Sequence, residues 1–197
     1  MKPPISRKFR RAVADIDRIV SLAADEPSTI TGVKEALWPI LQSDSWLPDE
    51  YANAEDGRYE QYLLYRDPAS RFSIVSFAWG PGAGTPIHDH TTWGVVGVLR
   101  GAECATSYQL DERRMPFKSA PERRLERLSI DIVSPAMGDV HSVRNGFGDR
   151  TSVSLHVYGG NIGTIQRSIF RSESGRQKFV SGYSDRVPLL ESPRVRG

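Results

Sequence analysis

Residues 86–101 read PIHDHTTWGVVGVLRG, and this stretch decides the fold class. His88 and His90 are two residues apart, which is the period of a strand, so both imidazoles project from one face. His141, in the run GDVH, stands on a later predicted strand. Three neutral imidazoles suit iron, zinc or copper and leave coordination positions open. These histidines are candidate metal ligands; the alternative is a set of hydrogen-bonded histidines at strand ends.

Short apolar segments lie on both sides of this stretch and predict a mainly β protein. Each contains β-branched or aromatic residues, and turn-forming residues separate them at the spacing typical of an antiparallel sandwich or barrel. The predicted strands are Tyr59–Arg66, Phe72–Trp79, Trp93–Leu99, Cys104–Leu110, Leu125–Val133, Ser152–Tyr158 and Ile165–Arg171. We expect an antiparallel β-barrel that brings the three histidines together.

The first fifty residues have the period of helices rather than of strands. Phe9, Val13 and Ile16 recur at three- and four-residue spacing, as on the buried face of an amphipathic helix. A second amphipathic segment follows, and Pro39 lies within it. Because the proline ring blocks a backbone hydrogen bond, Pro39 is expected to kink or shorten that helix. The sequence therefore predicts an N-terminal helical layer on the barrel.

Composition places the chain among ordinary soluble proteins. Of its 197 residues, 39% are apolar and 25% are charged, and the formal net charge is only +2. This balance gives no global basic field for binding nucleic acid. The arginines between Asp111 and Arg127 alternate with acids, which is typical of a solvated hairpin. We expect one domain over residues 1–197, with the helical layer in 1–50 and the barrel in 59–185.

Cellular location is predicted from the apolar runs and the cysteine content. The longest aliphatic run is about Val95–Leu99, far short of the roughly 20 residues needed to span a bilayer. The basic N-terminus lacks a long apolar segment. Cys104, the single cysteine, cannot form an intrachain disulfide and is expected to pack as a small apolar side chain. We expect a cytoplasmic protein with no membrane or nucleic-acid partner.

Two spaced motifs resemble the signatures of the cupin superfamily. The first is Gly82, five residues, then HDH at residues 88–90, reaching Gly101; the second is Gly138, two residues, His141, three residues, Asn145. Together with PIHDH (86–90), LRG (99–101) and GDVHSV (138–143), they resemble the bacterial thiol dioxygenases of the cysteine dioxygenase type I family, over about residues 59–167. The resemblance implies a jelly-roll barrel, ferrous iron, Fe(2+), as cofactor, and a small thiol and O2 as substrates that yield a sulfinic acid.

Gly94 marks a departure from the general cupin pattern. Most cupins place a glutamate ligand after the histidine pair, whereas the alignment to Gly101 puts Gly94 there. Three imidazoles without a carboxylate leave an iron ion its full double positive charge, which favours binding of an anionic thiolate. In the cysteine-specific enzymes this position carries a cysteine crosslinked to the active-site tyrosine. No such thioether is expected here.

Ser154, His156 and Tyr158 alternate along one predicted strand and share one face. In the resembled family, a serine, a histidine and a tyrosine in this arrangement form a hydrogen-bond chain beside the iron. The resemblance implies that Tyr158 contacts substrate or oxygen, that His156 orients Tyr158, and that Ser154 orients His156. A Ser/His hydrolase is the alternative, but no Gly-x-Ser-x-Gly elbow surrounds Ser154 and no orienting acid is evident.

Two further positions bear on the substrate. The cysteine-specific enzymes have an arginine that clamps the substrate carboxylate where this chain has Gln61, and an amide cannot form the bidentate pair that a guanidinium forms. This substitution resembles the branch of the family that oxidises 3-mercaptopropionate, whose members have a later arginine near the site. Arg167 is the candidate for it, and the alternative is a surface arginine on a strand. We predict a preference for 3-mercaptopropionate over L-cysteine.

Two other functional classes stay open at the level of sequence. Three histidines could hold zinc with an activated water, as in a hydrolase or lyase. A cupin could also bind a small ligand without catalysis, although no DNA-binding motif accompanies this one. The sequence carries no signal for the oligomeric state.

Overall fold

A computed structural model describes residues 5–171, 175–184 and 188–191. In these ranges the helices are α1 (Arg7–Leu22) and α2 (Glu26–Leu41), followed by a short 3-10 turn, η1 (Asp49–Tyr51). Side chains cap both helices at their N-termini: Ser6 accepts a hydrogen bond from the Lys8 amide at 3.2 Å, and Asp25 accepts one from Ser28 at 2.8 Å. None of the described helices is both long and apolar enough to cross a membrane.

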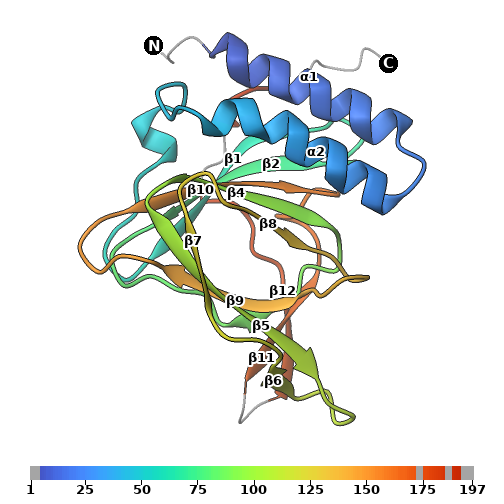
Figure 1. The fold of residues 1–197 in the computed structure, drawn as a ribbon, viewed down its shortest axis with the longest axis vertical. Coiled ribbons are helices and arrows are strands. Elements are labelled where there is room, and N and C mark those ends of the chain that lie inside the picture. Colours follow the sequence, from blue (N-terminus) through green and yellow to red (C-terminus); the bar gives the residue numbers. More distant parts are fainter. Residues whose placement is uncertain (1–4, 172–174, 185–187, 192–197) are drawn as a thin grey trace.

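The strands form two antiparallel sheets that face each other (Figure 1). The first sheet has the order β1-β2-β10-β4-β8, and the second has the order β12-β11-β3-β9-β5-β6 with β7 paired to β5. The strand bounds are β1 Tyr59–Arg66, β2 Ser73–Trp79, β3 Ile87–His88, β4 Gly94–Arg100, β5 Ala102–Leu110, β6 Pro116–Lys118, β7 Arg123–Glu126, β8 Ile130–Val133, β9 Val140–Asn145, β10 Ser152–Tyr158, β11 Arg167–Arg171 and β12 Gly175–Phe179. The predicted mainly β jelly-roll barrel with an N-terminal helical layer is confirmed.

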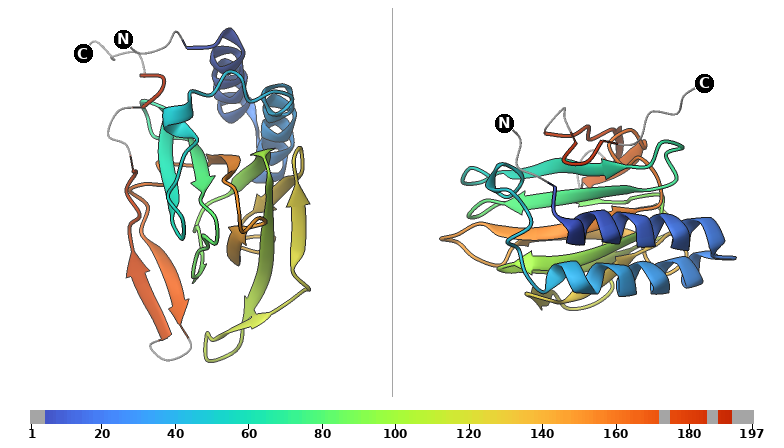
Figure 2. Two further views of the ribbon diagram at one scale, coloured as in Figure 1. Left: turned by 90° about the vertical axis from the view of Figure 1, so that its left-hand side faces the viewer. Right: turned by 90° about the horizontal axis from the view of Figure 1, so that it is seen from above.

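Each face of the first sheet packs against a different apolar cluster. Both helices lie on its outer face, and the β11–β12 hairpin extends away from them (Figure 2). On β10, Val153, Leu155 and Val157 belong to the cluster under the helices. Tyr158 belongs to a second cluster between the sheets, with side chains from β2, β4, β5 and β9. The alternation along β10 therefore separates the structural face of the strand from the face that lines the barrel interior.

Gly97 permits the close approach of helix α2 to the first sheet. A Cβ atom at this position would lie 2.6 Å from a methyl carbon of Leu41. Leu41 is fully buried at the end of α2, so it has no room to move away. The glycine therefore allows helix α2 to pack directly against β4.

One prediction about local structure is wrong. The segment Leu125–Val133 is two strands, because Leu128 has a φ of 74° and the chain turns there from β7 in the second sheet to β8 in the first. Pro39 lies within its helix, which ends two residues later at Leu41. Pro39 is exposed in the last turn, where the missing backbone bond faces solvent.

The arginine-rich stretch forms β6, β7 and the turns around them. Two of its arginines pair with acids: Arg123 contacts Asp131 at 2.8 Å, and Arg124 contacts Glu126 at 2.6 Å. These pairs offset the charge of two of the arginines. The last described strand ends at Phe179, so residue 185, the predicted end of the barrel, lies outside the described residues.

Candidate active site

The three predicted metal ligands meet between the sheets. His88, at the end of β3, lies directly opposite His141 of β9 in an antiparallel pair, and His90 follows two residues later. The three ring centroids are each 4.8 Å from the other two. All three side chains are buried, and one nitrogen from each lies within 4.8 Å of the other two. The long-range pairing of β3 with β9 therefore assembles the cluster that the sequence predicts.

Hydrogen bonds on Nδ1 orient two of the rings. Nδ1 of His88 lies 3.0 Å from the carbonyl oxygen of Pro86, and Nδ1 of His90 lies 3.1 Å from Oδ1 of Asp139. Asp139 also accepts the backbone amides of His90 at 3.0 Å and Thr91 at 2.8 Å, which holds the carboxylate in place. Because both Nδ1 atoms are used, Nε2 is the atom that these two histidines offer to a metal.

The environment keeps the three histidines neutral. Burial lowers the pKa of His88 to about 4, and it lowers the pKa values of His90 and His141 well below their usual range. A neutral imidazole has the free lone pair that a metal ligand requires. The cluster therefore fits a divalent transition metal such as iron or zinc, since these accept imidazole nitrogen readily.

Gly94 lies too close to its neighbours for any side chain. A Cβ atom there would be 2.8 Å from Cδ1 of Tyr158 and 2.8 Å from a methyl of Val133. Neither a glutamate ligand nor a crosslinking cysteine can occupy this position with the Tyr158 ring where it is. The three-imidazole donor set is therefore a consequence of packing as well as of sequence.

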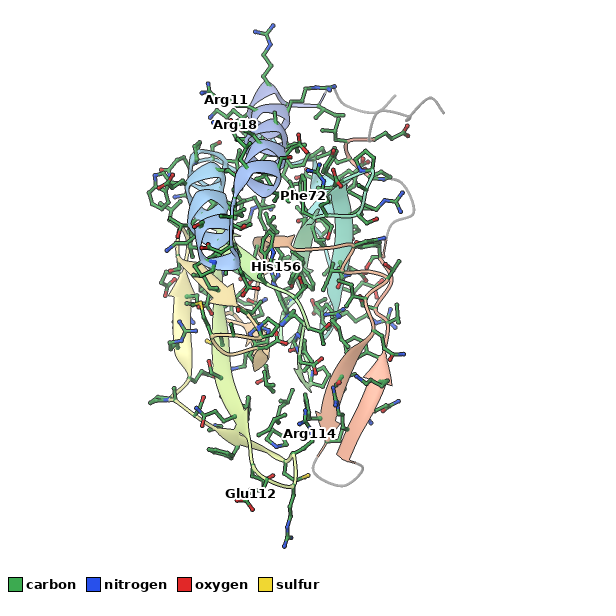
Figure 3. The ribbon with its side chains drawn as sticks, turned by 90° about the vertical axis from the view of Figure 1, so that its right-hand side faces the viewer. Arg11, Arg18, Phe72, Glu112, Arg114 and His156 are labelled. Atoms are coloured by element: carbon green, nitrogen blue, oxygen red, sulfur yellow. The ribbon has the colours of Figure 1, made fainter. Side chains whose placement is uncertain are left out.

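The predicted hydrogen-bond chain on β10 is present. The Tyr158 hydroxyl lies 2.8 Å from Nδ1 of His156, and Nε2 of His156 lies 2.8 Å from Oγ of Ser154. Tyr158 also stacks on His90, with ring centroids 5.5 Å apart. Figure 3 places His156 among the strands in the middle of the molecule, away from Glu112 and Arg114 at the far end.

Burial determines the protonation states of His156 and Tyr158. It lowers the pKa of His156 to about 3 and raises the pKa of Tyr158 above its usual range. Both groups are therefore neutral near pH 7. A neutral imidazole between two hydroxyls can accept a hydrogen bond on one nitrogen and donate from the other.

Glu103 is a buried acid beside this chain that the sequence interpretation missed. It lies on β5 and is 1% exposed, and burial raises its pKa to about 7 although hydrogen bonding from Ser154 and Trp79 opposes the rise. Among the described residues, the ring nitrogens of His156 contact only Ser154 and Tyr158, so no acid orients this histidine. Glu103 lies on the serine side of the pair, so the order differs from a hydrolase triad, in which the acid orients the histidine. A charged residue within the otherwise apolar run Ala102–Ala105 was the available signal.

Arg167 is buried, so the alternative of a surface arginine is wrong. It is 3% exposed at the start of β11, and its guanidinium lies 4.7 Å from the ring centroid of Phe179. Its Nη2 donates to Oγ of Ser181 at 2.6 Å, whereas its Nε has no hydrogen-bond partner among the described residues. An unsatisfied buried guanidinium N–H is costly unless a ligand accepts it.

Gln61 of β1 contacts the same serine, Ser181, as Arg167 does. Its amide nitrogen donates to Oγ of Ser181 at 3.1 Å and to the carbonyl of Gly182 at 2.7 Å. These two bonds use both amide hydrogens and hold Ser181 next to Arg167. Gln61, Ser181 and Arg167 thus form one connected polar group.

These groups line a single cavity of about 40 Å³. Its walls combine the three metal-site histidines with His156, Tyr158, Gln61, Arg167 and Ser181, and with aromatic and aliphatic side chains. Cys104 is buried, as expected, and does not line the cavity. The volume limits a buried ligand to a few non-hydrogen atoms.

Comparison with known proteins agrees with this geometry. The family model for cysteine dioxygenase type I matches residues 3–170. A cysteine dioxygenase type 1 of Rattus norvegicus is 28% identical over 194 residues, covering 92% of each chain. One of Danio rerio is 24% identical over 185 residues, covering 83% of this chain and 92% of the relative.

Solved structures with a similar architecture were also found. A Klebsiella pneumoniae protein with a double-stranded β-helix domain has a TM-score of 0.45 at 19% identity, covering 57% of this chain and 87% of its own. The Schizosaccharomyces pombe Cnp3 cupin domain has a TM-score of 0.41 at 15% identity, covering 55% and 66%. Because the family model spans most of the sequence, including all three clustered histidines, the chain belongs to the cysteine dioxygenase type I family.

Proposed function

We propose that this protein is a mononuclear non-haem iron thiol dioxygenase whose metal ligands are His88, His90 and His141. The single observation that carries the proposal is the buried cluster of three neutral histidines without a carboxylate. When bound, ferrous iron supplies a site where a thiolate sulfur and dioxygen meet. The overall reaction, R–SH + O2 → R–SO2H, places both oxygen atoms on sulfur and needs no other reductant.

Arg167 is the proposed anchor for the substrate carboxylate. Arg167 lines the cavity that the histidines share; its Nη2 donates to Ser181, and its Nε–H has no partner among the described residues. A carboxylate accepting from a guanidinium forms a short, charge-assisted pair. Anchoring one end of a small substrate in this way directs its other end toward the histidine cluster, which reduces the entropy cost of bringing the reacting groups together.

Gln61 contributes to the substrate site through Ser181. Because both amide hydrogens of Gln61 are engaged, it holds the Ser181 hydroxyl beside Arg167. The Ser181 hydroxyl accepts from Gln61 and Arg167 and donates to the carbonyl of Gly182 at 3.2 Å, which fixes its position beside the guanidinium. Gln61 and Ser181 thus contribute neutral polar groups where an arginine at position 61 would bring a second positive charge.

The charges lining the cavity favour 3-mercaptopropionate over L-cysteine. L-cysteine carries an α-ammonium group that 3-mercaptopropionate lacks, and a buried ammonium needs an anionic partner. No Asp or Glu lines the cavity in the described part of the chain, and Arg167 already places a positive charge there. A bound ammonium would therefore meet repulsion without compensation.

Tyr158 is the proposed catalytic residue, positioned by His156 and Ser154. Its hydroxyl lies at the cavity, and its raised pKa keeps the phenol neutral. A neutral hydroxyl can hydrogen-bond to substrate or oxygen without placing a negative charge in the site. The chain of two 2.8 Å bonds behind it fixes where the phenol oxygen lies.

Oxygen uptake and sulfinate formation test the proposal. Protein reconstituted anaerobically with ferrous iron should form a sulfinate from 3-mercaptopropionate with a higher kcat/KM than from L-cysteine. Metal analysis of protein purified without added metal distinguishes the alternatives. Stoichiometric zinc with turnover independent of oxygen would instead support a hydrolase or lyase. Ligand binding without any sulfinate from either thiol would remove the dioxygenase class.

A further inference from the structure

Glu103 lies at the inner end of the Ser154–His156–Tyr158 chain, and the proposed reaction assigns it no role. In the register of β5 it pairs with Asn145 of β9 on one side and Leu125 of β7 on the other. It is 1% exposed, and its Oε1 has no hydrogen-bond partner among the described residues. A buried carboxyl with an unsatisfied oxygen is costly to keep, so its position calls for a functional explanation.

The donors and acceptors around Ser154 restrict where its hydroxyl hydrogen can point. The indole of Trp79 can only donate, and its Nε1 donates to Oγ of Ser154 at 3.1 Å. The Ser154 hydrogen must therefore go elsewhere. It can go to Nε2 of His156, at 2.8 Å, or to the buried carboxyl of Glu103, where burial raises the pKa and hydrogen bonding from Ser154 and Trp79 lowers it.

When Glu103 is ionised, the hydrogen bonds through Ser154, His156 and Tyr158 all point toward its carboxylate. A carboxylate can only accept, so Ser154 donates to Glu103 and its oxygen accepts from Nε2–H of His156. Nδ1 of His156 is then unprotonated and accepts the Tyr158 hydroxyl. In this state the Tyr158 oxygen offers only lone pairs to the cavity.

When Glu103 is protonated, the same hydrogen bonds point the opposite way, from Glu103 toward Tyr158. Its carboxyl hydrogen goes to Oγ of Ser154, and Ser154 donates to Nε2 of His156. Nδ1 of His156 then carries the hydrogen and donates to the Tyr158 oxygen, which leaves the Tyr158 hydrogen free to point into the cavity. His156 is neutral in both states because burial holds its pKa at about 3.

We propose that Glu103 is a positioning residue whose charge sets the direction of the hydrogen bonds through Ser154 and His156, and thereby whether Tyr158 presents a donor or an acceptor to the metal site. The proposal deepens the proposed function and rests on it for its catalytic consequence. The change from ionised to protonated Glu103 conserves protons. Tyr158, His156 and Ser154 each pass one proton to the next group toward Glu103, and Tyr158 takes up one proton from the cavity.

The groups around Glu103 place this change near neutral pH. Burial raises its pKa to about 7, hydrogen bonding from Ser154 and Trp79 opposes the rise, and the Asp131 carboxylate of β8 adds to it. Asp131 is paired in turn with Arg123 of β7. Tyr158 of β10 also interacts electrostatically with Glu103, and the Glu103 carboxylate contributes to the raised pKa of Tyr158.

The direct test is the tautomer of His156, read from its ring 15N shifts in metal-free protein. In the wild type, the protonated and unprotonated ring nitrogens should exchange identity as the pH rises from about 5 to about 9. Glu103→Gln should abolish this pH dependence. As a matched control, Asp131→Asn should keep the exchange and move its midpoint to lower pH. One unchanging tautomer in the wild type, or an exchange that survives in Glu103→Gln, would overturn the proposal.

The iron-loaded enzyme gives a second readout. Glu103→Gln should flatten the pH profile of kcat around neutrality and leave KM within about twofold, since no substrate contact is removed. A wild type that forms no sulfinate would refute the dioxygenase and leave the NMR result standing. An active wild type whose kcat profile is matched by Glu103→Gln would refute the role of Glu103 alone.

Discussion

Gly94 and Tyr158 are in such close contact that a single carbon atom at Gly94 would collide with the tyrosine ring, at 2.8 Å from Cδ1. The contact joins two neighbouring strands of the first sheet, because Gly94 of β4 pairs directly with Tyr158 of β10. It keeps the ring against His90 and the hydroxyl against His156. The absence of a side chain at one residue thus determines the position of the proposed catalytic residue.

Gly94→Ala should therefore destabilise the fold and displace Tyr158. Forcing a methyl group into a packed core costs about 1–3 kcal/mol in the free energy of unfolding. Chemical denaturation measures the cost, and kcat should fall together with stability. Gly148→Ala is the matched control, because nothing lies within 4 Å of a Cβ atom there. Equal stability of the two variants would contradict the assigned contact.

His141→Ala should lose the metal. Removing one of the three imidazoles leaves two donors, and no carboxylate among the described cavity-lining residues can take the place of the lost ligand. Metal content after dialysis, measured by mass spectrometry, should fall to a small fraction of the wild-type value. His156→Gln, outside the cluster, should keep its metal. Iron at wild-type occupancy in His141→Ala would remove His141 from the ligand set.

Asp139→Asn should weaken metal binding without removing a ligand. The Asp139 carboxylate holds the ring of His90 through Nδ1 and its backbone through the amide. Loss of such a supporting hydrogen bond lowers metal affinity by about 10- to 100-fold. Competition with a chelator measures the change. An affinity equal to that of the wild type would show that backbone contacts alone orient His90.

Arg167→Gln should raise KM for 3-mercaptopropionate more than it lowers kcat. A hydrogen bond to a charged group contributes about 1.5–3 kcal/mol, which corresponds to roughly 10- to 150-fold in binding. Steady-state oxygen uptake separates the two constants. Arg171→Gln, on the exposed end of the same strand, should leave both unchanged. An unchanged KM in Arg167→Gln would place the carboxylate elsewhere.

Glu103 should make stability depend on pH between about 4.5 and 7. The pKa of Glu103 is raised from 4.5 in the unfolded chain to about 7 in the fold, so the native state binds the proton more tightly. This contribution is fully present below pH 4.5 and is lost as pH rises through 7, a cost of up to about 3 kcal/mol. Glu103→Gln should therefore gain stability relative to wild type at pH 8 but not at pH 4. Denaturant midpoints at the two pH values measure this, and parallel midpoints would contradict the raised pKa.

Local periodicity predicted the parts of the site that lie on one strand. Ser154, His156 and Tyr158 share a face because side chains alternate along any strand, and that rule needs no knowledge of neighbouring strands. The boundary error has a local cause as well. The turn at Leu128 depends on a positive φ at a leucine, a conformation that no residue-type rule predicts.

The amino-acid sequence by itself therefore determined the β class, the histidine pair, the polar face of one strand and the family, since each is a matter of spacing along the chain. Only the tertiary structure decided that His88 faces His141, that Arg167 is buried beside Gln61 and Ser181, and that Glu103 lies against Ser154. These relationships depend on strand register and on burial. Both are set by which distant strands pair, and a one-residue change in register would turn each side chain to the opposite face.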